Sequence, residues 1–140
     1  MHSWSICLFA TVLAISASTA IGGEPVDANA ALSPDARAFL LRFTTAASSR
    51  DWITLRAILS DDFKHSFGFD GDDSDKAVEK WRKNPVELDE MVRVVERGCF
   101  QDTTTGNSIE CPGETETGLR GGMSRDPSGQ WKLKWFLAGD

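Results

Sequence analysis

The sequence predicts an α+β domain, with helices first and a sheet at the C-terminal end. Apolar residues recur at helical spacing in two early segments and then alternate with polar residues from Phe63 to Phe69. The last third combines alternating runs with glycine and proline turn signals, which is typical of antiparallel strands. These patterns together predict helices packed on an antiparallel sheet.

The N-terminal segment is predicted to be a leader, because no charged residue precedes Glu24. Residues 6–15 form an apolar run, and Ser18 and Ala20 supply the small residues that signal peptidase prefers. The run is too short to cross a bilayer, which takes roughly 20 apolar residues. We expect a signal peptide over residues 1–20, cleaved near Ala20, and a secreted or periplasmic protein. A retained membrane anchor is the alternative; after cleavage we expect no stable membrane insertion.

The rest of the chain is predicted to be a flexible lead-in over residues 21–32 and a single domain over residues 33–140. Its length allows one hydrophobic core. The net charge of −6 and the pI near 4.9 disfavour binding to nucleic acid or to an anionic membrane through a general electrostatic field. We therefore expect no nucleic-acid partner.

Two cysteines remain after leader removal takes Cys7. An even number of cysteines in a chain sent to an oxidising compartment predicts a disulfide between Cys99 and Cys111. Closing so short a loop stabilises a fold by about 2 to 3 kcal/mol in the chain-entropy model. Two independent buried thiols are the alternative. A zinc site is disfavoured, because two cysteines with one distant histidine do not complete a tetrahedral set.

The first two helices are predicted from their caps and apolar stripes. Ser33 suits an N-cap and Pro34 the first turn of a helix that continues to about Ala47. A second helix is predicted with Ser49 as its cap and Leu59 on its apolar face, ending at the "SDD" of residues 60–62.

A strand and two more helices are predicted to follow. In the strand from Phe63 to Phe69, His65 shares the buried face with the phenylalanines. The acidic run at residues 70–75 caps a short helix that includes Trp81. A longer helix over residues 85–97 is marked by Asn84 as cap, a capping box with Glu87, and Gly98 as terminator.

The C-terminal hairpin is predicted from a turn at Pro127 and Ser128, with Gly129 in a left-handed bulge position. Residues 98–112 before it are predicted to form a loose hairpin or loop held by the disulfide. The register pairs Leu119 with Leu137, Gly121 with Trp135, Met123 with Leu133 and Arg125 with Trp131. One face then carries Trp131, Leu133 and Trp135, and the other carries Arg120, Lys132, Lys134 and Phe136. Gly118, Gly121 and Gly122 weaken their strand, but they let it bend sharply or admit the Trp135 indole over the backbone.

This order of elements, ending in "WKLKWFLAGD", resembles secreted members of the NTF2-like superfamily. The resemblance implies a cone in which the N-terminal helices pack on a strongly curved antiparallel sheet. The helix over residues 85–97 is an addition to that pattern. The superfamily includes isomerases, dehydratases, polyketide cyclases and non-catalytic binding modules, so the resemblance alone does not select a function.

His65 is the candidate catalytic residue, because an imidazole can act as a general base near neutral pH. Asp61 or Asp62 would orient it. The alternative is a core histidine bonded to the backbone. A ligand pocket lined by His65, Phe67, Trp81 and Trp135 is the second candidate site, and core packing of the tryptophans is its alternative.

The acidic run of Asp70, Asp72, Asp73 and Asp75 fails the calcium-loop template, since Asp75 stands at the glycine position and Trp81 at the glutamate position. We expect no metal and no cofactor. The leading hypothesis is a non-catalytic binding module for a small apolar ligand or a secreted protein partner. A small isomerase- or dehydratase-like enzyme using His65 is one alternative. An inhibitor or immunity-type protein that contacts its partner through residues 70–75 is the other.

Overall fold

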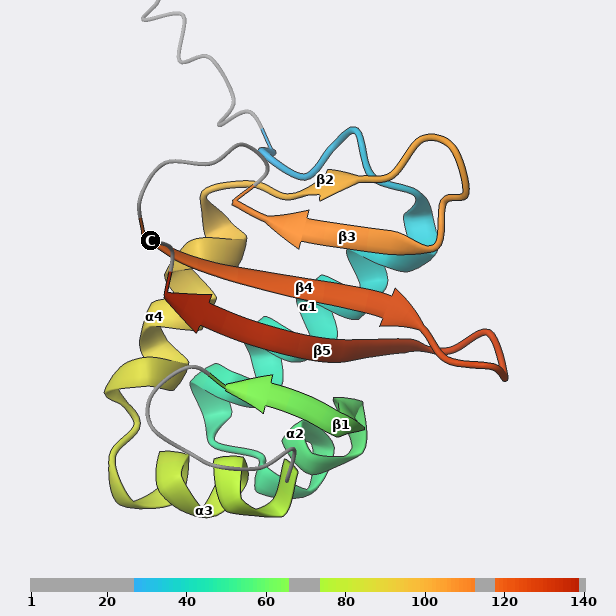
Figure 1. Ribbon diagram of the computed structural model, residues 1–140. Coiled ribbons are helices and arrows are strands. Elements are labelled where there is room, and N and C mark those ends of the chain that lie inside the picture. The colour runs from blue at the N-terminus through green and yellow to red at the C-terminus, as the bar shows by residue number, and fades with distance from the viewer. Residues whose placement is uncertain (1–26, 66–73, 113–117, 139–140) are drawn as a thin grey trace, which may run out of the picture.

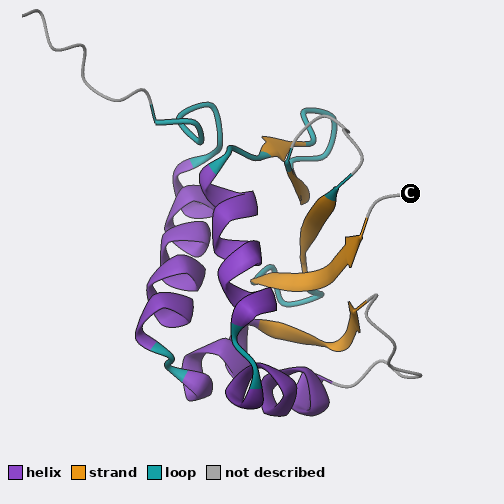
Figure 2. Ribbon diagram, turned by 90° about the vertical axis from the view of Figure 1, so that its left-hand side faces the viewer, coloured by secondary structure: helices purple, strands orange, loops and turns teal. Residues whose placement is uncertain are grey.

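The computed structural model describes residues 27–65, 74–112 and 118–138. Within these ranges the helices are α1 (Pro34–Ser49), α2 (Trp52–Ile58), α3 (Ser74–Lys83) and α4 (Val86–Glu96). The strands are β1 (Leu59–His65), β2 (Phe100–Gln101), β3 (Ser108–Cys111), β4 (Leu119–Arg125) and β5 (Trp131–Ala138). The helices pack on one face of an open, curved sheet, with α3 below its β1 edge (Figures 1 and 2), which confirms the α+β class.

The sheet has the strand order β1-β5-β4-β3-β2, as Figure 1 shows from bottom to top. The strands β2 to β5 pair antiparallel, but β1 runs parallel to β5. The expectation of a purely antiparallel sheet is therefore wrong at this edge. No hairpin joins β1 to β5, since residues 66–130 lie between them, and no short turn forces their directions to oppose.

The predicted hairpin register is confirmed next to the turn and wrong beyond it. Met123 pairs with Leu133 and Arg125 with Trp131, and Gly129 has a φ of +85°. Past Met123 the pairing shifts by one residue, so that Gly122 and not Gly121 lies opposite Trp135. A bulge explains the shift, because two residues of β5 then occupy the space of one.

Because of the bulge, the last residues of β5 lie on the opposite side of the sheet from the one predicted. Phe136 is fully buried against the helices, whereas the sequence predicted it on the opposite face. Trp135 turns to the side of the sheet that the helices do not cover, and its indole lies over Gly122. A Cβ atom at Gly122 would come within 2.0 Å of the ring, so only glycine leaves room for this indole. The prediction that a glycine admits Trp135 over the backbone is confirmed.

The boundary between α1 and α2 differs from the prediction. α1 runs to Ser49, Arg50 takes a left-handed φ of 57°, and Asp51 is the residue that caps α2. The Asp51 carboxylate accepts a hydrogen bond from the backbone N–H of Thr54 at 3.0 Å. α2 then ends at Ile58, and Leu59 begins β1 instead of continuing the helix. The expected alternation at Phe67 and Phe69 lies outside the described residues.

The ends of α4 follow the sequence signals to within one residue. The Asn84 side chain accepts a hydrogen bond from the Val86 N–H at 3.3 Å, and Gly98 follows the helix with a φ of 112°. Leu88, Met91, Val94 and Val95 of α4 join the core. The side chain of Glu87, predicted to complete a capping box, instead reaches residues of β1 and α3.

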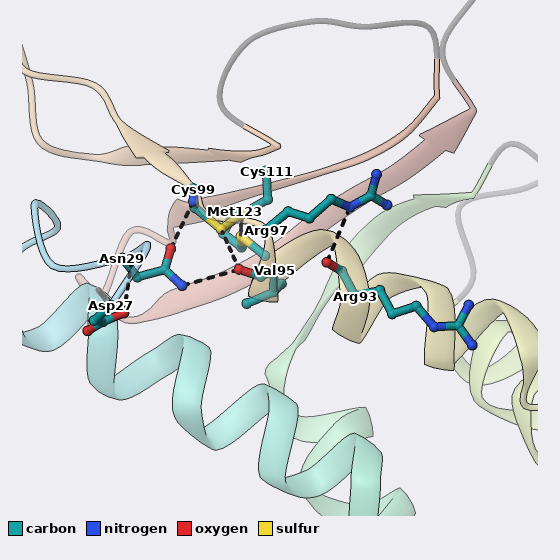
Figure 3. Close-up of a disulfide and its surroundings, with 8 residues drawn as sticks. All are labelled: Asp27, Asn29, Arg93, Val95, Arg97, Cys99, Cys111 and Met123. Carbon is teal, nitrogen blue, oxygen red and sulfur yellow. Dashed lines mark hydrogen bonds between the residues drawn. A yellow bond between two sulfur atoms is a disulfide. The ribbon is translucent and has the colours of Figure 1, made fainter. Parts of the chain in front are cut away.

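The predicted disulfide between Cys99 and Cys111 is present and joins the end of α4 to β3 (Figure 3). Asn29 lies beside it, accepting a hydrogen bond from the Cys99 N–H at 2.8 Å and donating one to the Val95 carbonyl at 3.2 Å. Leu32 is buried in the core. Residues 27–32, part of the predicted lead-in, thus pack against the domain.

A helix that crosses a bilayer must be long and apolar. None of the helices in residues 27–65, 74–112 and 118–138 is long and apolar enough to do so.

Candidate functional site

His65 lies at the end of β1 and points toward the helix layer. Its imidazole packs against Phe63, Trp81 and Phe136, with ring centroids 6.3 to 6.4 Å apart. Only 5% of its side chain is exposed. The position shared with Phe63 follows from strand alternation, as the sequence predicted.

The carboxylate next to His65 belongs to Glu87, from the first turn of α4. The His65 Nε2 atom is 2.8 Å from Glu87 Oε2, and Lys80 Nζ of α3 is 2.5 Å from Glu87 Oε1. His65 and Glu87 would form an ion pair only with a protonated imidazole, and the imidazole N–H does not point squarely at the oxygen. Three elements distant in sequence thus bring an imidazole, a carboxylate and an ammonium together.

Burial lowers the pKa of His65 below its usual value of 6.5. The Glu87 carboxylate opposes this change, and the Lys80 ammonium adds to it. The imidazole is therefore predominantly neutral at neutral pH, in the form that can accept a proton.

Asp61 and Asp62, the acids predicted to orient His65, pair with other side chains. Asp62 lies 2.5 Å from Lys134 Nζ, and Asp61 lies 3.6 Å from an Arg56 nitrogen. Strand alternation explains the position of Asp62, because it directly precedes the buried Phe63 and so faces the other side. Glu87 was missed because its sequence context indicated a helix cap. A short-range pattern cannot show a contact made 22 residues away.

Trp81 is a core residue, with no exposed surface, and it packs edge to face on Phe63. Its indole N–H has no hydrogen-bond acceptor among the described residues. Phe67, another predicted ligand-binding residue, lies outside the described residues.

Trp135 is the predicted pocket residue that the structure separates from His65. The two lie on adjacent strands, where Lys64 pairs with Trp135 and His65 with Phe136. His65 faces the helices and Trp135 faces away from them, so one pocket cannot be lined by both. The bulge in β5 is the physical cause.

The side of the sheet opposite the helices is here called the outer sheet face. A row of residues paired across all five strands runs along it: Lys64, Trp135, Gly122, Glu110 and Phe100. Phe100 is 54% exposed, and Trp135 is partly exposed over Gly122. Beside this row the face carries Ser108, Arg120, Ser124, Lys132 and Leu137. None of the four described helices covers it (Figure 2).

Two of the grooves on the helix layer have apolar side chains in their linings. One of about 550 Å³ separates α2 from α3 and is lined by Trp52, Ile53 and Arg82 among others. The second, of about 520 Å³, lies between α1 and α4 and has Leu40, Leu41 and Val95 in its lining. Each combines apolar and charged side chains, and neither lining includes His65 or Trp135.

The acidic run at residues 70–75 is described only from Ser74 onward. Asp75 pairs with Arg56 of α2, and Asp70, Asp72 and Asp73 lie outside the described residues. Within the described ranges, no three side chains of histidine, cysteine, aspartate or glutamate gather closely enough to hold a metal ion.

Comparisons with protein-family models, with curated proteins and with solved structures gave no match.

Proposed function

We propose that this domain is a non-catalytic binding module that recognises a protein partner through its outer sheet face. The observation that carries the proposal is the position of Trp135, whose indole lies on Gly122 in the middle of a face that the helices leave uncovered. Phe100 adds a second exposed aromatic ring on the same row.

The physical argument concerns how tryptophan contributes to protein recognition. Interface residues whose loss weakens binding most are enriched in tryptophan, tyrosine and arginine. An indole that already rests on the backbone of Gly122 has fewer orientations to lose when a partner covers it, which lowers the entropic cost of binding. An open sheet also offers a broad surface, as a protein partner requires.

The test is photo-crosslinking from the outer sheet face in the secreted fraction of the native host. A photoreactive phenylalanine analogue replaces Phe100 in the full chain, and the proteins crosslinked to it are compared between the parent chain and the variant Trp135→Ala. We expect defined crosslinked partners whose yield falls at least about tenfold in Trp135→Ala, the loss typical of an interface anchor.

Ile53 of α2 provides the matched control, because it is 84% exposed and belongs to the helix layer. The variant Ile53→Ser should keep the crosslinked partners. Equal loss in both variants, or no dependence on Trp135, would contradict the proposed binding face.

Acid–base catalysis at His65 is a second candidate, and the contact of 2.8 Å with Glu87 favours it. A carboxylate beside a neutral imidazole is the arrangement that a general base requires. It ranks second because the His65 side chain is almost fully buried. A proton-transfer probe such as 5-nitrobenzisoxazole tests it: turnover above the background rate should disappear in His65→Gln and persist in Asp62→Asn. Equal rates in the parent chain and His65→Gln would exclude this candidate.

Two further expectations remain proposals. The order of two helices, a strand, more helices and a final meander supports an NTF2-like cone with one added helix. The disulfide supports an oxidising compartment, and hence secretion. N-terminal sequencing of the mature protein tests the second proposal, since cleavage near Ala20 predicts a chain that begins at about Ile21.

A further inference from the structure

We infer that the partner of the outer sheet face presents an acidic surface with an apolar residue at its centre. This inference rests on the proposed binding function and adds to it the chemistry of the partner. Two observations support it: the charged side chains around Trp135 are mainly positive, whereas the chain as a whole is negative.

Cationic side chains outnumber carboxylates on this face. With the pair of Asp62 and Lys134 at its border included, the described residues of this face comprise four cations, namely Lys64, Arg120, Lys132 and Lys134, against two carboxylates, Asp62 and Glu110. The chain as a whole carries a net charge of −6. Among the described residues, the outer sheet face therefore carries an excess of positive charge on a chain that is negative overall.

The cations differ in how far they are already neutralised. Lys134 pairs with Asp62, and this contact holds the pKa of the Asp62 carboxyl below its usual range. Lys132 donates a hydrogen bond to the Ala57 carbonyl at 2.7 Å, which leaves its charge without a carboxylate. Lys64 and Arg120 are exposed and form no ion pair with the described residues. These last two are the charges best placed to meet a partner.

Lys64 and Arg120 both lie near the Trp135 indole on the outer sheet face. Lys64 lies directly opposite Trp135 in the pairing of β1 with β5. Arg120 precedes Gly122 by two residues on β4, so it shares the face with the ring and pairs with Leu137. A partner that covers Trp135 with an apolar side chain would bring its neighbouring side chains within reach of both cations. Carboxylates at those positions give the complementary charge.

The experiment uses three synthetic 15-residue peptides as probes, composed of glutamate, leucine and phenylalanine, of glutamine, leucine and phenylalanine, or of lysine, leucine and phenylalanine. Each is titrated into the full 140-residue chain labelled with ¹⁵N, and the Trp135 indole and Gly122 amide signals are followed by NMR. We expect the glutamate peptide to perturb these signals most strongly and the lysine peptide least.

Charge-reversal variants then locate the effect. Lys64→Glu and Arg120→Glu should each weaken binding of the glutamate peptide by about three- to fivefold, and added salt should weaken it further. Lys83→Glu is the matched control, because Lys83 is 74% exposed on α3 and makes the same change of charge on the helix layer. It should leave the affinity within about twofold, because Lys83 belongs to the helix layer, where it pairs with Glu79, and not to the outer sheet face.

The outcomes separate the two proposals. Equal binding of the glutamate and glutamine peptides at Trp135, or no effect of either reversal, would overturn the inference about charge and leave the proposed binding face supported. Perturbation of other surfaces only, by all three peptides, would overturn both.

Discussion

At the scale of single residues, Gly122 and Trp135 show how one side chain can depend on the absence of another. The indole occupies the space where a Cβ atom of residue 122 would stand. Neither residue is unusual in the sequence by itself. The bulge at Lys134 brings them opposite each other and turns Trp135 outward.

We predict that Gly122→Ala destabilises the fold by about 1 to 3 kcal/mol, the usual cost of forcing an extra methyl group into a filled space. The measurement is urea denaturation. Gly121→Ala is the matched control, because a Cβ there would lie at ordinary distances of 3.7 and 3.8 Å from its neighbours. In a Trp135→Ala background the cost of Gly122→Ala should nearly vanish. An undiminished cost in that background would show that the ring is not the obstacle.

We predict that His65 makes the domain less stable as the pH falls below about 6.5. Burial lowers the pKa of the folded imidazole, whereas the unfolded one keeps a value near 6.5. The unfolded state then binds more protons in this window, so the free energy of unfolding rises with pH and falls on acidification. Denaturation curves at pH 7.5, 6.5 and 5.5 should give a smaller pH dependence for His65→Gln than for the parent chain.

His2, the other histidine of the chain, supplies the control for this experiment, because it belongs to the predicted leader. His2→Gln should retain the pH dependence of the parent chain. A parent chain that gains stability between pH 7.5 and 5.5 would contradict the direction assigned to the pKa of His65.

At the scale of elements, the disulfide holds the segment after α4 against β3. Its two cysteines are separated by 12 residues, and that segment includes β2. We predict that the double variant Cys99→Ser/Cys111→Ser loses about 3 kcal/mol of unfolding free energy, from the entropy of closing a loop of this size. Denaturation of the oxidised and reduced protein measures the loss. Cys7→Ser is the control and should behave as the parent chain, and a double variant of unchanged stability would contradict the assigned role.

Elements marked by local chemistry were the ones that could be predicted. Pro34 after Ser33 places the start of α1, Gly98 places the end of α4, and the turn at Pro127 to Gly129 fixes the near end of the hairpin. The disulfide followed from counting cysteines. Each signal acts within a few residues of the structure it specifies, so the sequence is sufficient there.

Features that depend on distant partners could not be predicted in the same way. The run "WKLKWFL" in β5 alternates well enough to place either Trp135 or Phe136 in the core, and the choice depends on Gly122 and on the helices that receive Phe136. The parallel pairing of β1 depends on how the helices pack. The contact of His65 with Glu87 depends on the helix packing and on the position of β1. The sequence therefore predicted His65 as a site residue but not Glu87.

At the scale of the whole molecule, the helix layer and the outer sheet face carry different functional groups. The helix layer buries His65 with Glu87 and Lys80, whereas the outer sheet face exposes aromatic rings among cations. Binding and proton transfer would therefore occur on opposite sides of the sheet. Variants on one side should leave the other side intact, which makes the two candidate functions separable by experiment.

The positive potential of the outer sheet face leads to a prediction that needs no partner. Iodide and caesium both quench tryptophan fluorescence, but a cationic surface concentrates the anion and repels the cation. The emission lost between the parent chain and Trp135→Phe reports Trp135, and we expect iodide to quench it more strongly than caesium when each ion is scaled to its quenching of free N-acetyltryptophanamide. The double variant Lys64→Gln/Arg120→Gln should reduce the difference, as should raised ionic strength, because both weaken the local field. Equal scaled quenching of Trp135 by the two ions at low salt would mean that the charges around the indole do not attract anions, and an acidic partner would lose its physical basis.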